Sequence, residues 1–341
     1  MFEVIKPGLQ TSIQDIGRRG FISRGIPPAG AFDSYSFRIG NLIVGNGVGG
    51  PFLISSENCE AGLELTFQGP GLRVLDDVVA ALTGADMSAT VDGKPFPMWE
   101  AFRLRRGETI TFGTAKRGAR GYLCVAGGFD VPLYLGSRST QIRGNLGGMQ
   151  GRCLKPGDQL PVGNPRRPMP SLEGRVFRQD LIPQFRNPLV IRVIMGPQND
   201  LYQEESLRLF LATEWKASSM MDRMGIRLIG PKLSFKPKPE HLKQFSGADP
   251  SNIVSDTIPI GGIQVPSGIE PIIMGVEGPG IGGYAKIATV ISADLSSLGQ
   301  IRPGDQLVFR EVNSREAVDA LREREALLQE TNIEVGGREH V

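Results

Sequence analysis

The residues best suited to chemistry lie in the run Gly282-Gly283-Tyr284-Ala285-Lys286. Tyr284 and Lys286 alternate with Ala285, so in a strand the two side chains would share one face. A phenol and an ammonium on one face can stabilise a developing oxyanion or bind a carboxyl group, and a plain surface pair is the alternative. Glu277 is the carboxylate beside the preceding glycine-rich loop, and it is a candidate catalytic base.

Three further polar residues of the second half are candidates for binding a substrate. Gln264 lies within the strand-like run Ile263-Gln264-Val265, so its amide points away from its β-branched neighbours, into solvent or into a pocket. Asp222 and Arg223 are adjacent. They form a local ion pair, or Arg223 presents its guanidinium to an anionic substrate.

The first half offers four more candidate substrate-binding residues. Arg24 precedes a stiff Pro-Pro loop, and it is either an exposed charge or an anion clamp. Asp33 ends that loop, where it caps a helix or orients a substrate N–H or a cation. The guanidinium of Arg138 is flanked in sequence by hydroxyl residues, among them Ser139, and such a group suits a carboxylate or a phosphate.

Composition and motifs exclude several other functions. The net charge is +2, so no basic excess points to nucleic acid. Two histidines and three cysteines without ligand spacing predict neither a metal site nor a Ser-His-Asp triad. Pro279 in the glycine-rich loop argues against a dinucleotide fold, and no phosphate-binding P-loop motif occurs. No long apolar run predicts a membrane span, and sparse cysteines favour a reducing, cytoplasmic location.

A repeated sequence motif indicates how these residues are positioned. Lys155-Pro156-Gly157-Asp158-Gln159-Leu160 returns as Arg302-Pro303-Gly304-Asp305-Gln306-Leu307, and Arg105-Arg106-Gly107-Glu108 is a weaker copy. Each predicts a tight turn that leads into a strand, because proline presets φ, glycine supplies positive φ and the acid caps its own turn. Two such endings predict two related β-rich halves, with a site at the seam between them.

The remaining elements follow from glycine and proline content and from apolar periodicity. The 45 glycines and 25 prolines fit many short strands joined by tight turns. Asp33, Asp200 and Ser314 are each expected to open a helix. The expected buried faces of those helices are Phe37, Leu42, Ile43 and Val44; Leu207, Phe210 and Leu211; and Val318, Leu321 and Leu328. The expected division is 1–163 and 189–311 for the two halves, 164–188 for a Pro- and Arg-rich linker, and 312–341 for a C-terminal helix and tail.

Several motifs together resemble one protein family, over about residues 3–310. The chain is similar to the family of KipA and the C subunit of 5-oxoprolinase, also called allophanate hydrolase subunit 2, which includes the second part of the urea carboxylase carboxyltransferase domain. The motifs that carry this resemblance are Gly25–Asp33, Leu42–Asn46, Arg120–Leu123, Gly127–Pro132, Leu135–Thr140, Gly196–Gln198, Asp222–Gly225, Gly262–Pro266 and Gly282–Ile291.

The resemblance implies a fold, partners and a chemistry. It implies a mainly β protein with two cyclophilin-like β-barrel subdomains, a few short helices and a C-terminal helix. It implies a KipI-like partner and a third, LamB/YcsF-like partner, which together with this chain hydrolyse 5-oxoproline to glutamate with ATP. In the urea carboxylase branch the same module moves a carboxyl group from carboxybiotin to an amide-type nitrogen. Both chemistries act on an O=C–N group.

One departure from the family pattern concerns the substrate. Many relatives carry Asp-x-Gln-Thr-Thr before Gly-Gly-Tyr, whereas this chain has Glu277-Gly278-Pro279-Gly280-Ile281 and thus lacks those hydroxyls and that amide. The sequence therefore leaves three functions open: an ATP-dependent 5-oxoprolinase-type subunit, a biotin-dependent carboxyltransferase subunit served by a separate biotin carrier, and a KipA-like regulatory binding protein without catalysis.

Overall fold

The computed structural model describes residues 1–50 and 59–335, and the chain divides into two compact units. Unit 1 comprises 1–19, 28–184 and 324–341, and unit 2 comprises 20–27 and 185–323. The short segment 20–27 thus belongs to the same unit as the second half of the chain. The end of the predicted tail, 336–341 with His340, lies outside the described residues.

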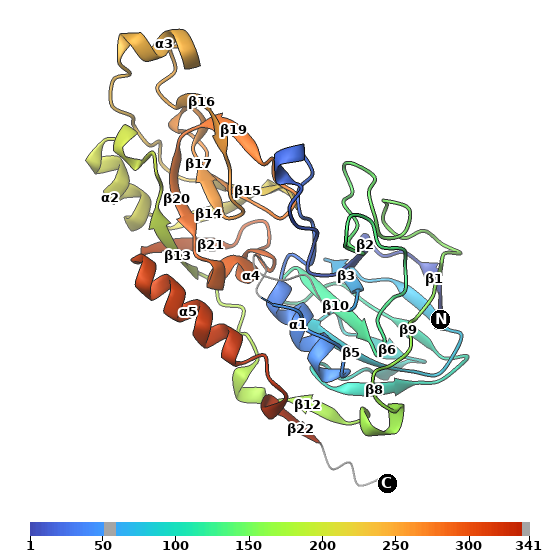
Figure 1. The fold of residues 1–341 in the computed structure, drawn as a ribbon. Helices are drawn as coiled ribbons and strands as arrows, with labels where there is room; N and C mark the ends of the chain where they lie inside the picture. The colour runs from blue at the N-terminus through green and yellow to red at the C-terminus, as the bar shows by residue number, and fades with distance from the viewer. Residues whose placement is uncertain (51–58, 336–341) are drawn as a thin grey trace. The chain divides into compact units, whose positions relative to one another are not determined.

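Unit 1 is built on two antiparallel sheets (Figure 1). The six-stranded sheet has the order β11 (Gln159–Leu160), β1 (Phe2–Lys6), β4 (Gly71–Val74), β9 (Thr109–Thr111), β6 (Thr90–Val91) and β7 (Lys94–Pro95). The five-stranded sheet has the order β2 (Gln10–Gln14), β3 (Gly62–Thr66), β10 (Arg120–Val125), β5 (Val78–Gly84) and β8 (Ala101–Leu104). A further pair joins β12 (Arg175–Phe177) to β22 (Ile333–Val335).

The five-stranded sheet is buried on both faces, which explains why its strands read as apolar runs. Along β10, Leu123 and Val125 face one core, while Tyr122 and Cys124 face another core shared with helix α1 (Ser34–Ile43). The helix packs on β5 and β10. A Cβ at Gly40 would lie 2.8 Å from the Sγ of Cys124, so this close approach requires glycine.

Unit 2 contains a closed seven-stranded barrel and a separate two-stranded ribbon (Figure 1). The barrel order is β13 (Leu189–Met195), β20 (Lys286–Val290), β17 (Gly262–Gln264), β18 (Ile272–Met274), β15 (Gly225–Ile229), β14 (Trp215–Met221) and β21 (Gln306–Glu311). The ribbon pairs β16 (Asn252–Thr257) with β19 (Ile281–Tyr284). The helices are α2 (Glu204–Ala212), α3 (Glu240–Ser246), α4 (Leu295–Leu298) and α5 (Ser314–Ala326), the last of which ends in residues of unit 1.

The prediction of a mainly β fold is confirmed, and one of the three predicted helix starts is wrong. Asp33 caps α1 as expected, but Asp200 lies in a 3₁₀ turn and α2 begins only after Gln203. The reason is Tyr202, whose buried hydroxyl donates to the carbonyl of Ala285 and holds the chain extended there.

Helix α5 begins at Ser314 as expected, but its capping residue is Asn313 and not Ser314. The side chain of Asn313 accepts from the N–H of Glu316, and Glu316 accepts from the N–H of Asn313, which is a capping box. Val318, which was expected to face inward, is 47% exposed, while Ala320 and Leu321 pack inward.

Candidate functional site

Seven of the ten candidate residues lie in unit 2 and three lie in unit 1. Unit 1 holds Asp33, Arg138 and Ser139, and unit 2 holds Arg24, Asp222, Arg223, Gln264, Glu277, Tyr284 and Lys286. A site at the seam of the two halves stays a prediction.

Three polar side chains, those of Gln264, Asp256 and Lys286, lie near Gly282 of the β16–β19 ribbon. We call these residues, together with Gly282 and Tyr284, the Gly282 site. Gln264 is buried, and its Nε2 donates to the carbonyl of Tyr284 at 3.0 Å. A Cβ placed on Gly282 would lie 3.2 Å from that nitrogen and 2.5 Å from Ile258 Cδ1. Asp256 pairs with Gly282 across the ribbon. Its side chain therefore leaves the same face as that of Tyr284, two residues beyond Gly282.

Lys286 supplies the positive charge of the Gly282 site. Its side chain is only 3% exposed, and its Nζ donates to Asp256 Oδ2 at 2.8 Å. Gln198 joins them, because its Oε1 accepts from the N–H of Lys286 and its Nε2 donates to Asp256. The Lys286 ammonium, followed by the N–H of Thr257, holds the pKa of the Asp256 carboxyl below its ordinary value.

Tyr284 and Lys286 do not form the expected pair on one strand face. The strand is interrupted at Ala285, whose N–H donates to Ser251 and whose carbonyl accepts from Tyr202. Tyr284 ends β19 with 40% of its surface exposed, whereas Lys286 begins β20 and is buried. The phenol is therefore available to a ligand and the ammonium is engaged by Asp256.

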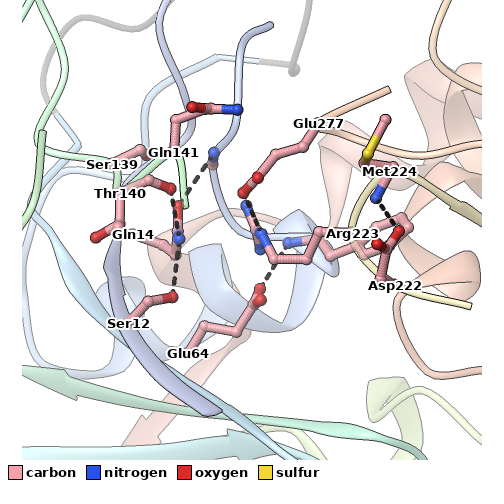
Figure 2. Close-up of polar contacts among 12 residues, drawn as sticks. Ser12, Gln14, Glu64, Ser139, Thr140, Gln141, Asp222, Arg223, Met224 and Glu277 are labelled. Carbon is pink, nitrogen blue, oxygen red and sulfur yellow. Dashed lines mark hydrogen bonds and ion pairs between the residues drawn. The ribbon is translucent and has the colours of Figure 1, made fainter. Parts of the chain in front are cut away.

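Arg223 pairs with Glu277 rather than with its neighbour Asp222. The Nε of Arg223 donates to Glu277 Oε1 at 2.5 Å, and both side chains are less than 5% exposed (Figure 2). Asp222 instead accepts from the N–H groups of Met224 and Gly225, which closes the β14–β15 turn. The expectation of a local Asp222–Arg223 ion pair is wrong, because the turn directs the two side chains to different partners.

The Arg223–Glu277 pair holds the glycine-rich loop that precedes β19. The N–H of Glu277 donates to the carbonyl of Arg223, so side chain and backbone fix the same point. Further along this loop, a Cβ on Gly280 would lie 2.5 Å from Ile22 Cγ2. The 3₁₀ turn Ile22–Arg24 therefore lies directly against the loop, and Arg24 itself is exposed with its guanidinium 5.8 Å from the Phe21 ring centre.

In unit 1, Arg138 and Ser139 belong to a turn organised by a buried carboxylate that the sequence did not single out. Asp15 accepts from the hydroxyls of Ser137 and Ser139 and from the N–H of Arg138. Its own N–H donates to the Ser139 hydroxyl. The Ser139 hydroxyl is thus committed to Asp15, while the Arg138 guanidinium reaches Asp130 and the carbonyl of Val131.

Gln14, the last residue of β2, is a second buried polar residue that makes several hydrogen bonds. The amide of Gln14 donates to Ser12 and to the carbonyl of Thr140, and accepts from the N–H of Gly30 (Figure 2). These bonds tie the end of the Pro-Pro loop to the segment that follows Arg138. Together the Asp15 and Gln14 contacts make this region a rigid scaffold.

Asp33 is a helix cap within a buried polar cluster. Its carboxylate accepts from the N–H and the hydroxyl of Ser36 at 3.0 and 2.6 Å. Its N–H donates to the Tyr122 hydroxyl, which in turn donates to Glu64. Burial, reinforced by the Glu64 charge, raises the pKa of Tyr122 well above its ordinary value. Asp33 therefore stabilises α1, and a ligand would have to displace Ser36 to reach it.

Metal-binding clusters and membrane-spanning helices are absent from the part of the chain that the structure describes. Within 1–50 and 59–335, no three His, Cys, Asp or Glu side chains gather as the ligands of a metal ion. In the same residues, every helix is too short or too polar to cross a bilayer.

The Gly282 site combines groups suited to holding a polar planar ligand. It offers an ionised carboxylate from β16, a carboxamide from β17 and an exposed phenol from β19. Gln198 and Asp256 were not predicted. Gln198 ends the motif Gly196-Pro197-Gln198, but only the hydrogen bonds of the folded chain show that Gln198 and Asp256 meet Lys286.

Comparison with known proteins gives a consistent result. A family model described as "Carboxyltransferase domain, subdomain A and B" matches residues 24–311. Urea amidolyase of Saccharomyces cerevisiae is 38% identical over 90% of this chain and 16% of its own length. The C subunit of 5-oxoprolinase from Haemophilus influenzae is 33% identical over 97% of both chains. The crystal structure of the K. lactis urea amidolyase superposes with a TM-score of 0.87 and 34% identity, over all of this chain and 20% of that one.

The fold and the matched residues define a carboxyltransferase-type β module. The chain belongs to the carboxyltransferase-domain family, subdomains A and B. Its relatives include proteins named as the C subunit of 5-oxoprolinase and as urea amidolyase. The chain spans about a sixth of the length of the urea amidolyases it matches.

Proposed function

We propose that this chain is one component of an ATP-dependent complex that opens a lactam, of the 5-oxoprolinase type. The observation that carries the proposal is the match to the C subunit of 5-oxoprolinase over 97% of both chains. That relative is named as one of several subunits, which implies that it works with others. The partners we propose here are a KipI-like subunit and a LamB/YcsF-like subunit.

In this proposal the chain binds and orients the substrate. The exposed phenol of Tyr284 donates to the lactam carbonyl, where negative charge develops when water adds to the carbon. Arg24, exposed beside the loop that leads into β19, is placed to attract an anionic substrate. Lys286 neutralises Asp256, and Glu277 is committed to Arg223, so we assign both a positioning role.

ATP would supply the free energy that drives ring opening. The chain has no P-loop motif, and its described residues gather no set of metal-ligating side chains. We therefore place ATP with the partner subunits and assign no step of ATP chemistry to residues of this chain.

A second candidate function is carboxyl transfer from carboxybiotin to an amide-type nitrogen. It is favoured by the higher identity to urea amidolyase, 38% against 33% for the 5-oxoprolinase relative. In that case carboxybiotin on a separate carrier protein would supply the carboxyl group. The same Gly282 site would then orient the accepting nitrogen.

The test is reconstitution of this chain with the two proposed partners. We expect glutamate and ADP to form from 5-oxoproline and ATP only when all three proteins are present. Turnover by this chain alone would contradict the proposal, as would a complete complex that leaves 5-oxoproline intact. Carboxyl transfer from free carboxybiotin to urea, measured in parallel, identifies the second candidate. Tight association without either reaction identifies a regulatory binding protein.

A further inference from the structure

The ammonium of Lys238 is surrounded by backbone carbonyl oxygens of unit 2. Lys238 lies before α3, which packs on β16 (Figure 1), and its half-buried side chain bonds to the end of this helix and to the segment that follows. Its Nζ donates to four carbonyl oxygens at 2.9–3.3 Å, and we call these oxygens the carbonyl cluster. They belong to Ser246, Gly247, Asp249 and Asn252. An ammonium has only three hydrogens, so the cluster surrounds its charge, and its oxygens do not each accept a hydrogen of their own.

The hydrogen bonds of this ammonium all go to neutral groups. No carboxylate of residues 1–50 and 59–335 forms a salt bridge with Lys238, whereas Lys243 and Lys286 each pair with an acid. Backbone carbonyl oxygens gathered around one position are the ligands with which proteins replace the hydration shell of K⁺, and an ammonium resembles K⁺ in charge and size. The carbonyl cluster therefore has the chemistry of a site for a monovalent cation, with a lysine side chain in it.

The carbonyl cluster fixes the segment from which β16 starts. Ser251 lies within this segment and is fully buried, and its carbonyl accepts from the N–H of Ala285 at 2.9 Å. Asn252, whose carbonyl belongs to the cluster, pairs with Tyr284 across the ribbon. A cation in the cluster therefore holds the part of β16 to which the chain is bonded at the break between Tyr284 and Lys286.

We propose that the carbonyl cluster is a binding site for a monovalent cation and that the Lys238 ammonium is its built-in occupant. The ligands that the site would accept are small cations: K⁺, ammonium or a primary alkylammonium. Because the lysine is tethered beside the site, its effective concentration there is high, and the unaltered chain needs no added cation. When the side chain at position 238 carries no charge, a free cation takes its place, and Lys238 is thus a positioning residue for the start of β16.

The first experiment removes the built-in cation and supplies a free one. Hydrogen exchange of the Ala285 amide is measured on the full chain carrying Lys238→Met, in chloride salts of equal ionic strength. In tetramethylammonium, which is too large for the cluster and donates no hydrogen bond, this amide should exchange roughly tenfold faster than in the unaltered chain. K⁺ or ammonium should restore most of the lost protection. Protection of Ala285 that is the same in all three salts would overturn the proposal.

Lys236→Met is the matched control. Lys236 lies two residues before Lys238, and its Nζ donates to a single carbonyl, that of Asp200, at 2.8 Å. Its loss should make no amide sensitive to the choice of cation. The N–H of Leu228, which donates to the carbonyl of Pro271 in the barrel at 2.8 Å, should exchange at one rate in all three salts for both variants. A K⁺ effect of equal size in the control variant, or at Leu228, would show a general salt effect and overturn the site.

The second experiment uses the unaltered chain, so it decides even if Lys238→Met does not fold. In protein with ¹⁵N-labelled lysine, NMR measures how fast the ammonium hydrogens exchange with water. Those of Lys238 should exchange roughly tenfold or more slowly than those of Lys236, because carbonyl oxygens surround the first ammonium and a single one binds the second. Equal exchange rates would overturn the proposal. Neither experiment involves turnover of 5-oxoproline, so failure of the cation site and failure of the proposed function are distinguishable.

Discussion

Arg223 and Glu277 form a buried ion pair in unit 2, with 2.5 Å between Nε and Oε1 and less than 5% of either side chain exposed. Removing Arg223 takes away the cation that faces the buried Glu277 carboxylate. We therefore expect Arg223→Met to lower the free energy of unfolding of unit 2 by about 3–5 kcal/mol. The chain has two tryptophans, and Trp215 lies in unit 2. Its fluorescence in a Trp99→Phe background measures this loss during urea unfolding.

The exposed Arg227–Glu270 pair of the same unit is the control for this prediction. Its side chains are 38% and 46% exposed, so Glu270→Gln should cost less than about 1 kcal/mol. The double variant Arg223→Met/Glu277→Leu should lose less than the sum of the single losses, since neither member of the pair then stays buried without the other. A single-variant loss as small as that of the control would show that the pair is not what holds the glycine-rich loop.

The carboxylate of Asp33 is the cap of α1, and its replacement should act on stability. Asp33→Ala removes both acceptors of Ser36 and should destabilise unit 1 by about 1–2 kcal/mol. Asp33→Asn keeps an accepting oxygen and should retain more than half of this stability. Thermal unfolding and hydrogen exchange of the first amides of α1 measure both effects. Equal losses for the two variants would argue that the charge of Asp33, and not its cap, is what matters.

Local turn chemistry could be predicted from the sequence. Gly157, Gly304 and Gly107 all have positive φ, between 84° and 95°. In each turn the following acid accepts from the N–H three residues earlier, at 2.7–2.8 Å. Four residues specify the shape of such a turn, because the acid and the N–H from which it accepts both lie within it. The Asp33 cap was predictable for the same reason, because Asp33 and Ser36 are only three residues apart. The mainly β character was predictable from the many short strands and tight turns that the sequence indicates.

Partners that lie far apart in the chain could not be predicted in this way. Glu277 is 54 residues from Arg223, and Asp256 is 30 residues from Lys286. The break at Ala285, which separates Tyr284 from Lys286, depends on bonds to Ser251 and Tyr202. Alternation along a strand holds only while the strand continues. The candidate site therefore needed the register of β16 and β19, which no local pattern contains.

Asp158 gives a prediction that depends on pH. Bonds from Arg152 at 2.7 and 2.8 Å hold the pKa of the Asp158 carboxyl below its ordinary value. Because the folded pKa is the lower one, the stabilisation is complete above the unfolded value of about 3.9 and is lost as pH falls through the folded pKa. Asp158→Asn should cost about 1–2 kcal/mol at pH 7 and almost nothing in strong acid.

Urea unfolding of both proteins between pH 2 and pH 7 measures this difference. Asp305→Asn is the matched control, because Asp305 closes the equivalent turn of the second repeat through the N–H of Arg302. The pH-dependent difference should be larger at Asp158. A difference that stays constant down to pH 2 would mean that the charge of Asp158 contributes nothing.

Replacing Tyr284 by phenylalanine distinguishes a catalytic role of its phenol from a structural role most directly. Its side chain is exposed at the end of β19, and no hydrogen bond within the described residues holds its hydroxyl. Tyr284→Phe should therefore change the free energy of unfolding by less than about 0.5 kcal/mol. If the hydroxyl donates to the substrate carbonyl in the transition state, the same variant should lower kcat of the reconstituted complex roughly 10- to 100-fold. Tyr134→Phe, at a similarly exposed tyrosine of unit 1, is the control and should leave kcat unchanged. A Tyr284→Phe complex that turns over as fast as the control would remove the phenol from the mechanism and leave it, at most, a contact for binding.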